Sequence, residues 1–181
     1  MALVIPHHGK HPVIPASAYL APTATIIGDV VLGEGASLWF NVVARGDVNF
    51  IRIGDRTNIQ DNSTLHVHMN DHPTVIGNDV VGGHNILLHG CTVKDRVLIG
   101  MGAILMDGVV VGEESIVAAG SLLAPGTRIP PRSLARGRPA RVVRSVTDEE
   151  VKSFILFGVE SYLRYKETYR EGQGSVAGKV S

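Results

Sequence analysis

Residues 93–129 read VKDRVLIGMGAILMDGVVVGEESIVAAGSLLAPGTRI, and an aliphatic side chain recurs at every sixth position of this stretch. The recurring residues are Val93, Ile99, Leu105, Val111, Val117, Leu123 and Ile129. The same period extends toward the N-terminus at Ile14, Leu20, Ile26, Leu32, Leu38, Ala44, Ile53, Ile59 and Leu65. Self-similarity at a short fixed period indicates a stacked repeat architecture. Three such hexads would close one triangular coil of about 18 residues, with coils stacking as parallel strands about 4.8 Å apart.

The composition narrows the classes of protein that fit. Hydrophobic residues make up 44% of the 181 residues but aromatic residues only 5%, which predicts a narrow interior of Val, Ile, Leu and Ala. The formal net charge is zero, so there is no electrostatic reason to expect a nucleic-acid or membrane partner. The single cysteine, Cys91, excludes an intrachain disulfide, and its register points it into the core. We expect a cytoplasmic protein.

Two insertions interrupt the six-residue period, and a helix is predicted after the last repeat. Three extra residues fall between Ala44 and Ile53 and five between Leu65 and Ile76, and we expect both to form corner loops. Thr147-Asp-Glu-Glu150 has the form of a capping box and predicts a helix over 148–169, with Gly158 as a weak point. The predicted organisation is a β-helix over 1–144, a packed helix over 145–170 and a disordered tail over 171–181.

Between residues 128 and 144 the chain carries a run of arginines without interleaved aromatic residues. We interpret this run as a solvated end of the solenoid rather than a nucleic-acid site. Its members are Arg128, Arg132, Arg136, Arg138, Arg141 and Arg144.

Three histidines of the repeat region, His66, His84 and His89, indicate a metal site. Leu65-His66 and Leu88-His89 occupy the same hexad slot in successive coils, because 23 residues separate them, one coil of about 18 plus the five inserted. Their side chains should therefore stack on one face. His84 falls in the preceding hexad, beyond a corner, so a neighbouring copy related by a threefold axis would have to present it to the pair. The register predicts a homotrimer with metal ions between subunits.

In several short motifs the chain resembles the γ-class carbonic anhydrases, whose subunits are left-handed β-helices of hexapeptide repeats. The resemblance rests on Arg45-Gly-Asp47, Asn58-Ile-Gln60-Asp61, His66 and Gly83-His84-Asn85 followed by Leu88-His89-Gly90. It implies an all-β fold with one C-terminal α-helix. The left-handed winding of the β-helix is implied by the resemblance alone. It covers roughly residues 12 to 170.

The resemblance also implies roles for individual residues. His66, His84 and His89 would be the metal ligands, with Zn²⁺ as the metal and Fe²⁺ or Co²⁺ also suited to three imidazoles. Asn58 and Gln60 would orient the nucleophile or bicarbonate. Arg45, Asp47 and Asp61 would form a charged cluster across the subunit interface. The implied reaction is the reversible hydration of CO₂ to bicarbonate.

The chain departs from the family pattern where protons leave the site. The archaeal prototype carries a Glu directly after Arg-Gly-Asp and another in the loop after the first histidine; here Val48 and a loop without Glu stand there. His68 or His72 would have to move the proton instead. Four alternatives stay open: an acyl-CoA thioesterase, a hexapeptide-repeat acyltransferase, a non-catalytic assembly protein, and a metal-binding protein with little CO₂ hydration.

Overall fold

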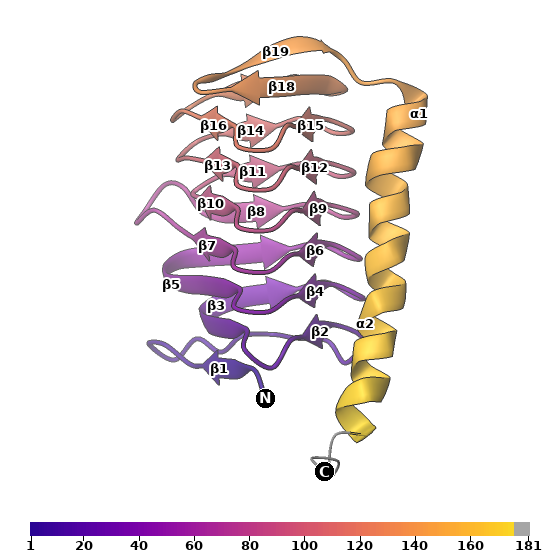
Figure 1. Ribbon diagram of the computed structural model, residues 1–181. Helices are drawn as coiled ribbons and strands as arrows, with labels where there is room; N and C mark the ends of the chain where they lie inside the picture. The colour runs from indigo at the N-terminus through magenta and orange to yellow at the C-terminus, as the bar shows by residue number, and fades with distance from the viewer. Residues whose placement is uncertain (176–181) are drawn as a thin grey trace.

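The computed structural model describes residues 1–175, with side chains as far as residue 172. The chain winds upward as a left-handed parallel β-helix with three faces, and a single long helix runs beside it (Figure 1). This is the predicted fold class, with the predicted C-terminal helix.

The strands fall into three stacks. The first face holds β7 (Thr64–His66), β10 (Leu87–His89), β13 (Ile104–Leu105) and β16 (Leu122–Leu123). The second face holds β8 (Thr74–Ile76), β11 (Thr92–Val93), β14 (Val110–Val111) and β17 (Arg128–Ile129). The third face holds β2 (Tyr19–Leu20), β4 (Ser37–Leu38), β6 (Asn58–Ile59), β9 (Val81–Gly82), β12 (Leu98–Ile99), β15 (Ile116–Val117) and β18 (Ser133–Gly137), with β19 (Ala140–Ser145) at its end.

The first insertion does not form the predicted corner loop. β3 (Thr25–Leu32) and β5 (Val43–Ile53) continue around the corner from the first face to the second, and β1 (Leu3–Ile5) pairs with β3. The extra residues of β5 are absorbed by a register shift against β3 between Gly28 and Val30. A bulge places additional residues in one strand without breaking it, so the insertion stays within a continuous 11-residue strand.

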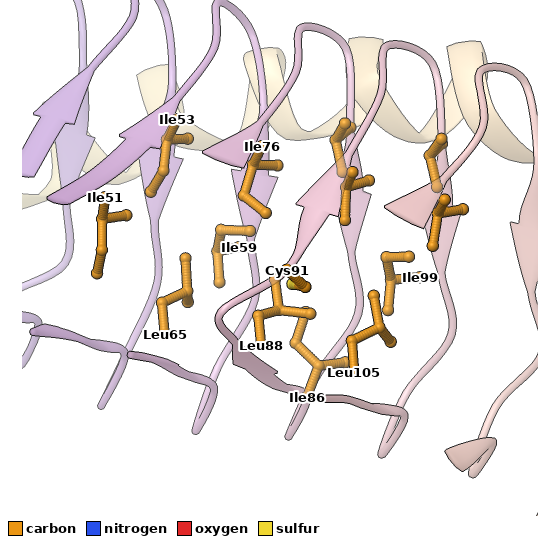
Figure 2. Close-up of a cluster of buried hydrophobic side chains, with 14 of the residues drawn as sticks. Ile51, Ile53, Ile59, Leu65, Ile76, Ile86, Leu88, Cys91, Ile99 and Leu105 are labelled. Carbon is orange, nitrogen blue, oxygen red and sulfur yellow. The ribbon is translucent and has the colours of Figure 1, made fainter. Parts of the chain in front are cut away.

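The core is a column of aliphatic side chains inside the prism, as the composition predicts. Figure 2 shows Leu65, Leu88 and Leu105 in a row along the prism, with Cys91 beside Leu88. All the buried members of this cluster are Ile, Leu, Val, Ala or Cys. Burial raises the pKa of the Cys91 thiol to about 12, so Cys91 acts as a small apolar core residue.

The helix begins at Asp148, as predicted, and packs along the third face. Thr147 and Glu150 form the predicted capping box. The helix comprises α1 (Asp148–Glu150), a π-helical turn η1 (Val151–Leu156) and α2 (Phe157–Ser175). A Cβ built on Gly158 would lie 3.1 Å from Val81 Cγ2, so glycine here allows close packing against β9.

The predicted disordered tail over 171–181 is helical as far as Ser175, because α2 continues past the predicted end at residue 170. Residues 176–181 lie outside the described residues. No helix in the described part of the chain is long and apolar enough to cross a membrane.

Candidate metal centre

His66 and His89 are the last residues of β7 and β10, and the strand register pairs them directly. Leu65 and Leu88, which precede them, point into the core and are fully buried. Because side chains alternate along a strand, the two imidazoles project outward from the same edge of the first face. The stacked pair predicted from the register is therefore confirmed.

The two rings approach each other through one nitrogen each. His66 Nδ1 lies 3.1 Å from His89 Nε2. A tetrahedral metal ion held at about 2.05 Å from both nitrogens would keep them about 3.3 Å apart. Two neutral lone pairs facing each other repel, so this approach requires a proton or a cation between them. The donor chemistry and spacing of the pair fit a zinc-type ion.

The outer nitrogen of each ring contacts a carboxylate. His66 Nε2 lies 3.0 Å from Asp47 Oδ1, and His89 Nδ1 lies 2.6 Å from Asp107 Oδ1. Metal-ligating histidines almost always make such a contact through their second nitrogen, which fixes the tautomer and the ring orientation. Each ring is thus held with its inner nitrogen directed at its partner.

Asp107 was not predicted from the sequence. It stands one coil of 18 residues after His89, in the turn that follows β13. The register that stacks the two histidines also places this carboxylate, because residue 107 lies one coil beyond residue 89.

Arg45 and Asp47 form an ion pair beside His66. Burial raises the pKa of Asp47, but hydrogen bonds from His66 and Arg45 outweigh it and hold that pKa below its usual range. Burial also lowers the pKa of His66, with Asp47 only partly opposing it. Both shifts keep Asp47 ionised and His66 neutral near pH 7, the forms that suit metal ligation.

The backbone around the pair is closely packed. Thr74 is the first residue of β8, directly after the second insertion. Its Oγ1 donates to the His66 carbonyl at 2.5 Å and accepts from Gly90 N at 3.0 Å. Gly90 has a φ of +56°, and a Cβ there would lie 2.3 Å from Asp107 Oδ1. Glycine at this position lets Asp107 reach His89.

His84 lies at the other edge of the first face, in the turn after β9. Its Nδ1 is 2.8 Å from Asp61 Oδ2, and its side chain is 45% exposed. No group of three His, Cys, Asp or Glu residues among the described positions could hold a metal ion within one protomer. One protomer therefore does not bring His84 to the His66–His89 pair.

Asn58 and Gln60 lie on the side of the prism that carries His84. Both are buried, and Gln60 Nε2 donates to Asn58 Oδ1 at 3.0 Å. Gln60 and His84 line one end of a mainly apolar groove of about 300 Å³. The charged cluster predicted from Arg45, Asp47 and Asp61 is divided in one protomer, since Asp61 contacts His84 while Arg45 and Asp47 lie beside His66.

The second insertion forms the expected corner loop beside the pair. His68 Nδ1 lies 2.8 Å from Asp71 Oδ1 on the exposed side, and this hydrogen bond raises the pKa of His68. The His72 ring lies 5.9 Å from the His68 ring, and a Cβ on Gly90 would lie 2.9 Å from the His72 Cβ. Two neighbouring imidazoles thus lie in the loop that follows His66.

Comparison with known proteins first defines the class. The family of bacterial transferase hexapeptide repeats matches residues 90–125. A solved structure described as a putative acetyltransferase of Bacillus cereus superposes with a TM-score of 0.87 at 45% identity, covering 92% of this chain and 98% of that one. The chain is a hexapeptide-repeat β-helix protein.

The curated relatives define the family. The chain is 49% identical to a carbonic anhydrase of Geobacillus kaustophilus, over 83% of this chain and 82% of that protein. It is 53% identical to a probable carbonic anhydrase of Methanocaldococcus jannaschii, over 84% and 92%. It is 49% identical to the mitochondrial gamma carbonic anhydrase 1 of Arabidopsis thaliana, over 84% of this chain but only 57% of that longer protein. The chain belongs to the γ-class carbonic anhydrase family.

Proposed function

We propose that this protein catalyses the reversible hydration of CO₂ to bicarbonate at a metal ion shared between two subunits of a homotrimer. His66 and His89 of one protomer and His84 of its neighbour would hold the ion. The observation that carries the proposal is the spacing of 3.1 Å between His66 Nδ1 and His89 Nε2, each ring being oriented by a carboxylate from behind. Membership of the carbonic anhydrase family supports the reaction.

The trimer is supported by the apolar character of the first face, which separates the two halves of the site. Leu87 and Met106 project outward from it, and Met101 lies at the corner near His84; they are 36%, 38% and 59% exposed. Contiguous exposed apolar side chains mark interaction surfaces. A copy covering this face would bring its own His84 edge toward the His66–His89 edge.

The bound ion would act as a Lewis acid that makes hydroxide available from water at neutral pH. Zn²⁺ fits the three-imidazole set best, and Fe²⁺ or Co²⁺ are accepted by the same ligands. Arg45, fixed by Asp47, would attract bicarbonate, while Asn58 and Gln60 would supply hydrogen bonds from the neighbouring subunit's edge.

Each hydration releases one proton, and the loop between β7 and β8 carries the residues best suited to accept it. His68 is exposed and hydrogen-bonded to Asp71, and His72 lies against the strand end that bears His89. Replacing both with alanine should slow turnover in dilute buffer and leave the rate normal in concentrated imidazole buffer. A cytoplasmic location remains a prediction from the sequence.

Mixing two inactive variants tests the shared site. His84→Ala keeps the pair and lacks the third ligand, whereas His89→Ala breaks the pair and keeps His84. Each variant alone should bind metal weakly and hydrate CO₂ poorly in a stopped-flow assay. In trimers assembled from equal amounts of both, about one interface in four joins an intact pair to an intact His84, so about a quarter of the activity and metal content should return.

The matched control mixes His66→Ala with His89→Ala, which damage the same pair and should not complement each other. Full metal affinity in His84→Ala alone would overturn the shared site. Restored metal content without CO₂ hydration would preserve the site and refute the reaction.

Acyl transfer or acyl-CoA hydrolysis is a second candidate, favoured by the mainly apolar groove that ends at Gln60 and His84. The Bacillus cereus structure described as a putative acetyltransferase points the same way. Assays with acetyl-CoA and longer acyl-CoAs on the metal-loaded trimer would separate this activity from CO₂ hydration.

A further inference from the structure

The C-terminal end of the solenoid is closed by an antiparallel hairpin of β18 and β19, which we call the arginine hairpin (residues 133–145). In the described part of the chain β19 pairs with β18 and with no other strand. Figure 1 shows β19 as the last layer above the stacked coils. Its outer edge therefore offers main-chain N–H and C=O groups that no strand of this protomer uses.

The charges of this hairpin are unbalanced. Arg136, Arg138 and Arg141 are exposed, and no carboxylate of the described residues lies within ion-pair distance of them. Arginines next to them do have partners: Arg132 contacts Asp148 at 2.5 Å and Arg144 contacts Glu150 at 2.7 Å. The positive charge concentrated here thus contrasts with a chain whose formal net charge is zero.

The strand register makes this arrangement unfavourable for the isolated chain. Arg136 and Arg141 are direct cross-strand partners. Like charges facing each other across an antiparallel pair are destabilising. An external anion between them would relieve that repulsion.

Exposed apolar side chains lie next to the arginines. Val142 and Val143 on β19 are 45% and 46% exposed. The register is irregular at this point, since Ala135 pairs with Val142 while Leu134 pairs with Arg144. A free edge strand with both cationic and branched apolar side chains suits an extended peptide that contributes main-chain hydrogen bonds, carboxylates and aliphatic contacts.

We propose that the arginine hairpin binds an extended acidic segment of a partner protein, which adds as a strand to the outer edge of β19. Its carboxylates would meet Arg136, Arg138 and Arg141, and its aliphatic residues would cover Val142 and Val143. Single-stranded nucleic acid is a poorer fit because the hairpin carries no aromatic side chain on which a base could stack. This inference is independent of the metal centre.

The test uses the full chain and a fluorescein-labelled peptide of alternating valine and glutamate, with binding followed by fluorescence anisotropy. We expect saturable binding that weakens with salt. The double reversal Arg136→Glu/Arg141→Glu should weaken binding by about tenfold or more. The matched control Lys152→Glu/Arg164→Glu makes the same change in net charge on the helix and should bind as the wild type does.

A peptide of the same sequence with alternate backbone nitrogens methylated separates strand addition from simple charge attraction. It keeps every carboxylate but loses hydrogen-bond donors, so strand addition predicts that it binds about tenfold more weakly. Equal binding of the two peptides would refute strand addition. Equal loss in the hairpin and control variants would refute the site.

Phosphatidylserine vesicles and polyuridylate complete the test. Both are anionic, and neither offers a peptide backbone. If either displaced the peptide from the hairpin at lower concentration than an unlabelled copy of the peptide does, the hairpin would be a lipid or RNA surface and the proposal would fail. Thermal melting of each variant verifies that the exposed substitutions leave the fold intact.

Discussion

Asp107 offers the most direct test of how the metal centre is built. Its Oδ1 lies 2.6 Å from His89 Nδ1, which is short for a nitrogen–oxygen hydrogen bond and typical of one assisted by charge. Removing a carboxylate that orients a ligating histidine typically weakens metal binding by about 10- to 100-fold, which is about 1.4 to 2.7 kcal/mol.

The structure predicts a graded series. Asp107→Asn keeps an oxygen that can accept from the ring and loses only the charge, so it should fall near the lower end of that range. Asp107→Ala loses both the charge and the acceptor and should fall near the upper end. Gly90→Ala should weaken metal binding about as much as Asp107→Ala does, although it keeps the carboxylate. Its new Cβ would lie 2.3 Å from Asp107 Oδ1 and would displace the carboxylate from His89.

The assay is competition for Zn²⁺ against a chromophoric chelator, with the oligomeric state measured on the same samples. Asp71→Asn is the matched control, because Asp71 lies 2.8 Å from His68, which is not a proposed ligand. It should leave metal affinity unchanged. Wild-type affinity in Asp107→Ala, together with a loss in His89→Ala, would refute the claim that Asp107 orients His89.

Three further predictions concern the scaffold. Cys91, buried with a pKa raised to about 12, should resist iodoacetamide at pH 8 in the folded protein and react once urea unfolds it; rapid labelling of the native protein would contradict the packing. The hydrogen bond from Arg144 lowers the pKa of Glu150 from its usual 4.5 to about 2, so this group stabilises the fold above pH 4.5 and the contribution disappears as the pH falls toward 2. Urea titrations should therefore show that Arg144→Ala loses stability at pH 7 but little at pH 2. Gly158→Leu should lower the melting temperature, since even a Cβ would lie 3.1 Å from Val81, whereas a leucine at the exposed position 152 should not.

The fold was predictable because a solenoid converts sequence spacing directly into spatial position. Once Leu65 and Leu88 are assigned to equivalent inward positions, the stacking of His66 on His89 follows, and the structure pairs them in that register. The reason is physical: an inward aliphatic residue every six positions leaves the outward residues no freedom to change faces.

Sequence spacing no longer predicts spatial position where the backbone stops being periodic. The spacing between Ala44 and Ile53 reveals three extra residues but not whether they leave the wall as a loop or remain inside β5 as a bulge. The structure adopts the bulge, which keeps Asp47 on the strand next to His66. Gly158 illustrates a related limit, since helix propensity describes the isolated helix and does not reveal the close approach of Val81.

The proposed division of ligands has a thermodynamic consequence. Within one protomer the described residues provide a pair of imidazoles and no third ligand, so the protomer should bind a metal ion far more weakly than the proposed trimer would. An ion that binds the assembled state in preference must favour assembly, by about 2.7 kcal/mol when its free concentration is 100 times the dissociation constant. In the proposed trimer, apolar contact across the exposed Leu87 and Met106 would not depend on the ion, so His84→Ala should still associate but lose the part of its association that depends on metal. The proposed shared site therefore predicts that metal affinity rises with subunit concentration.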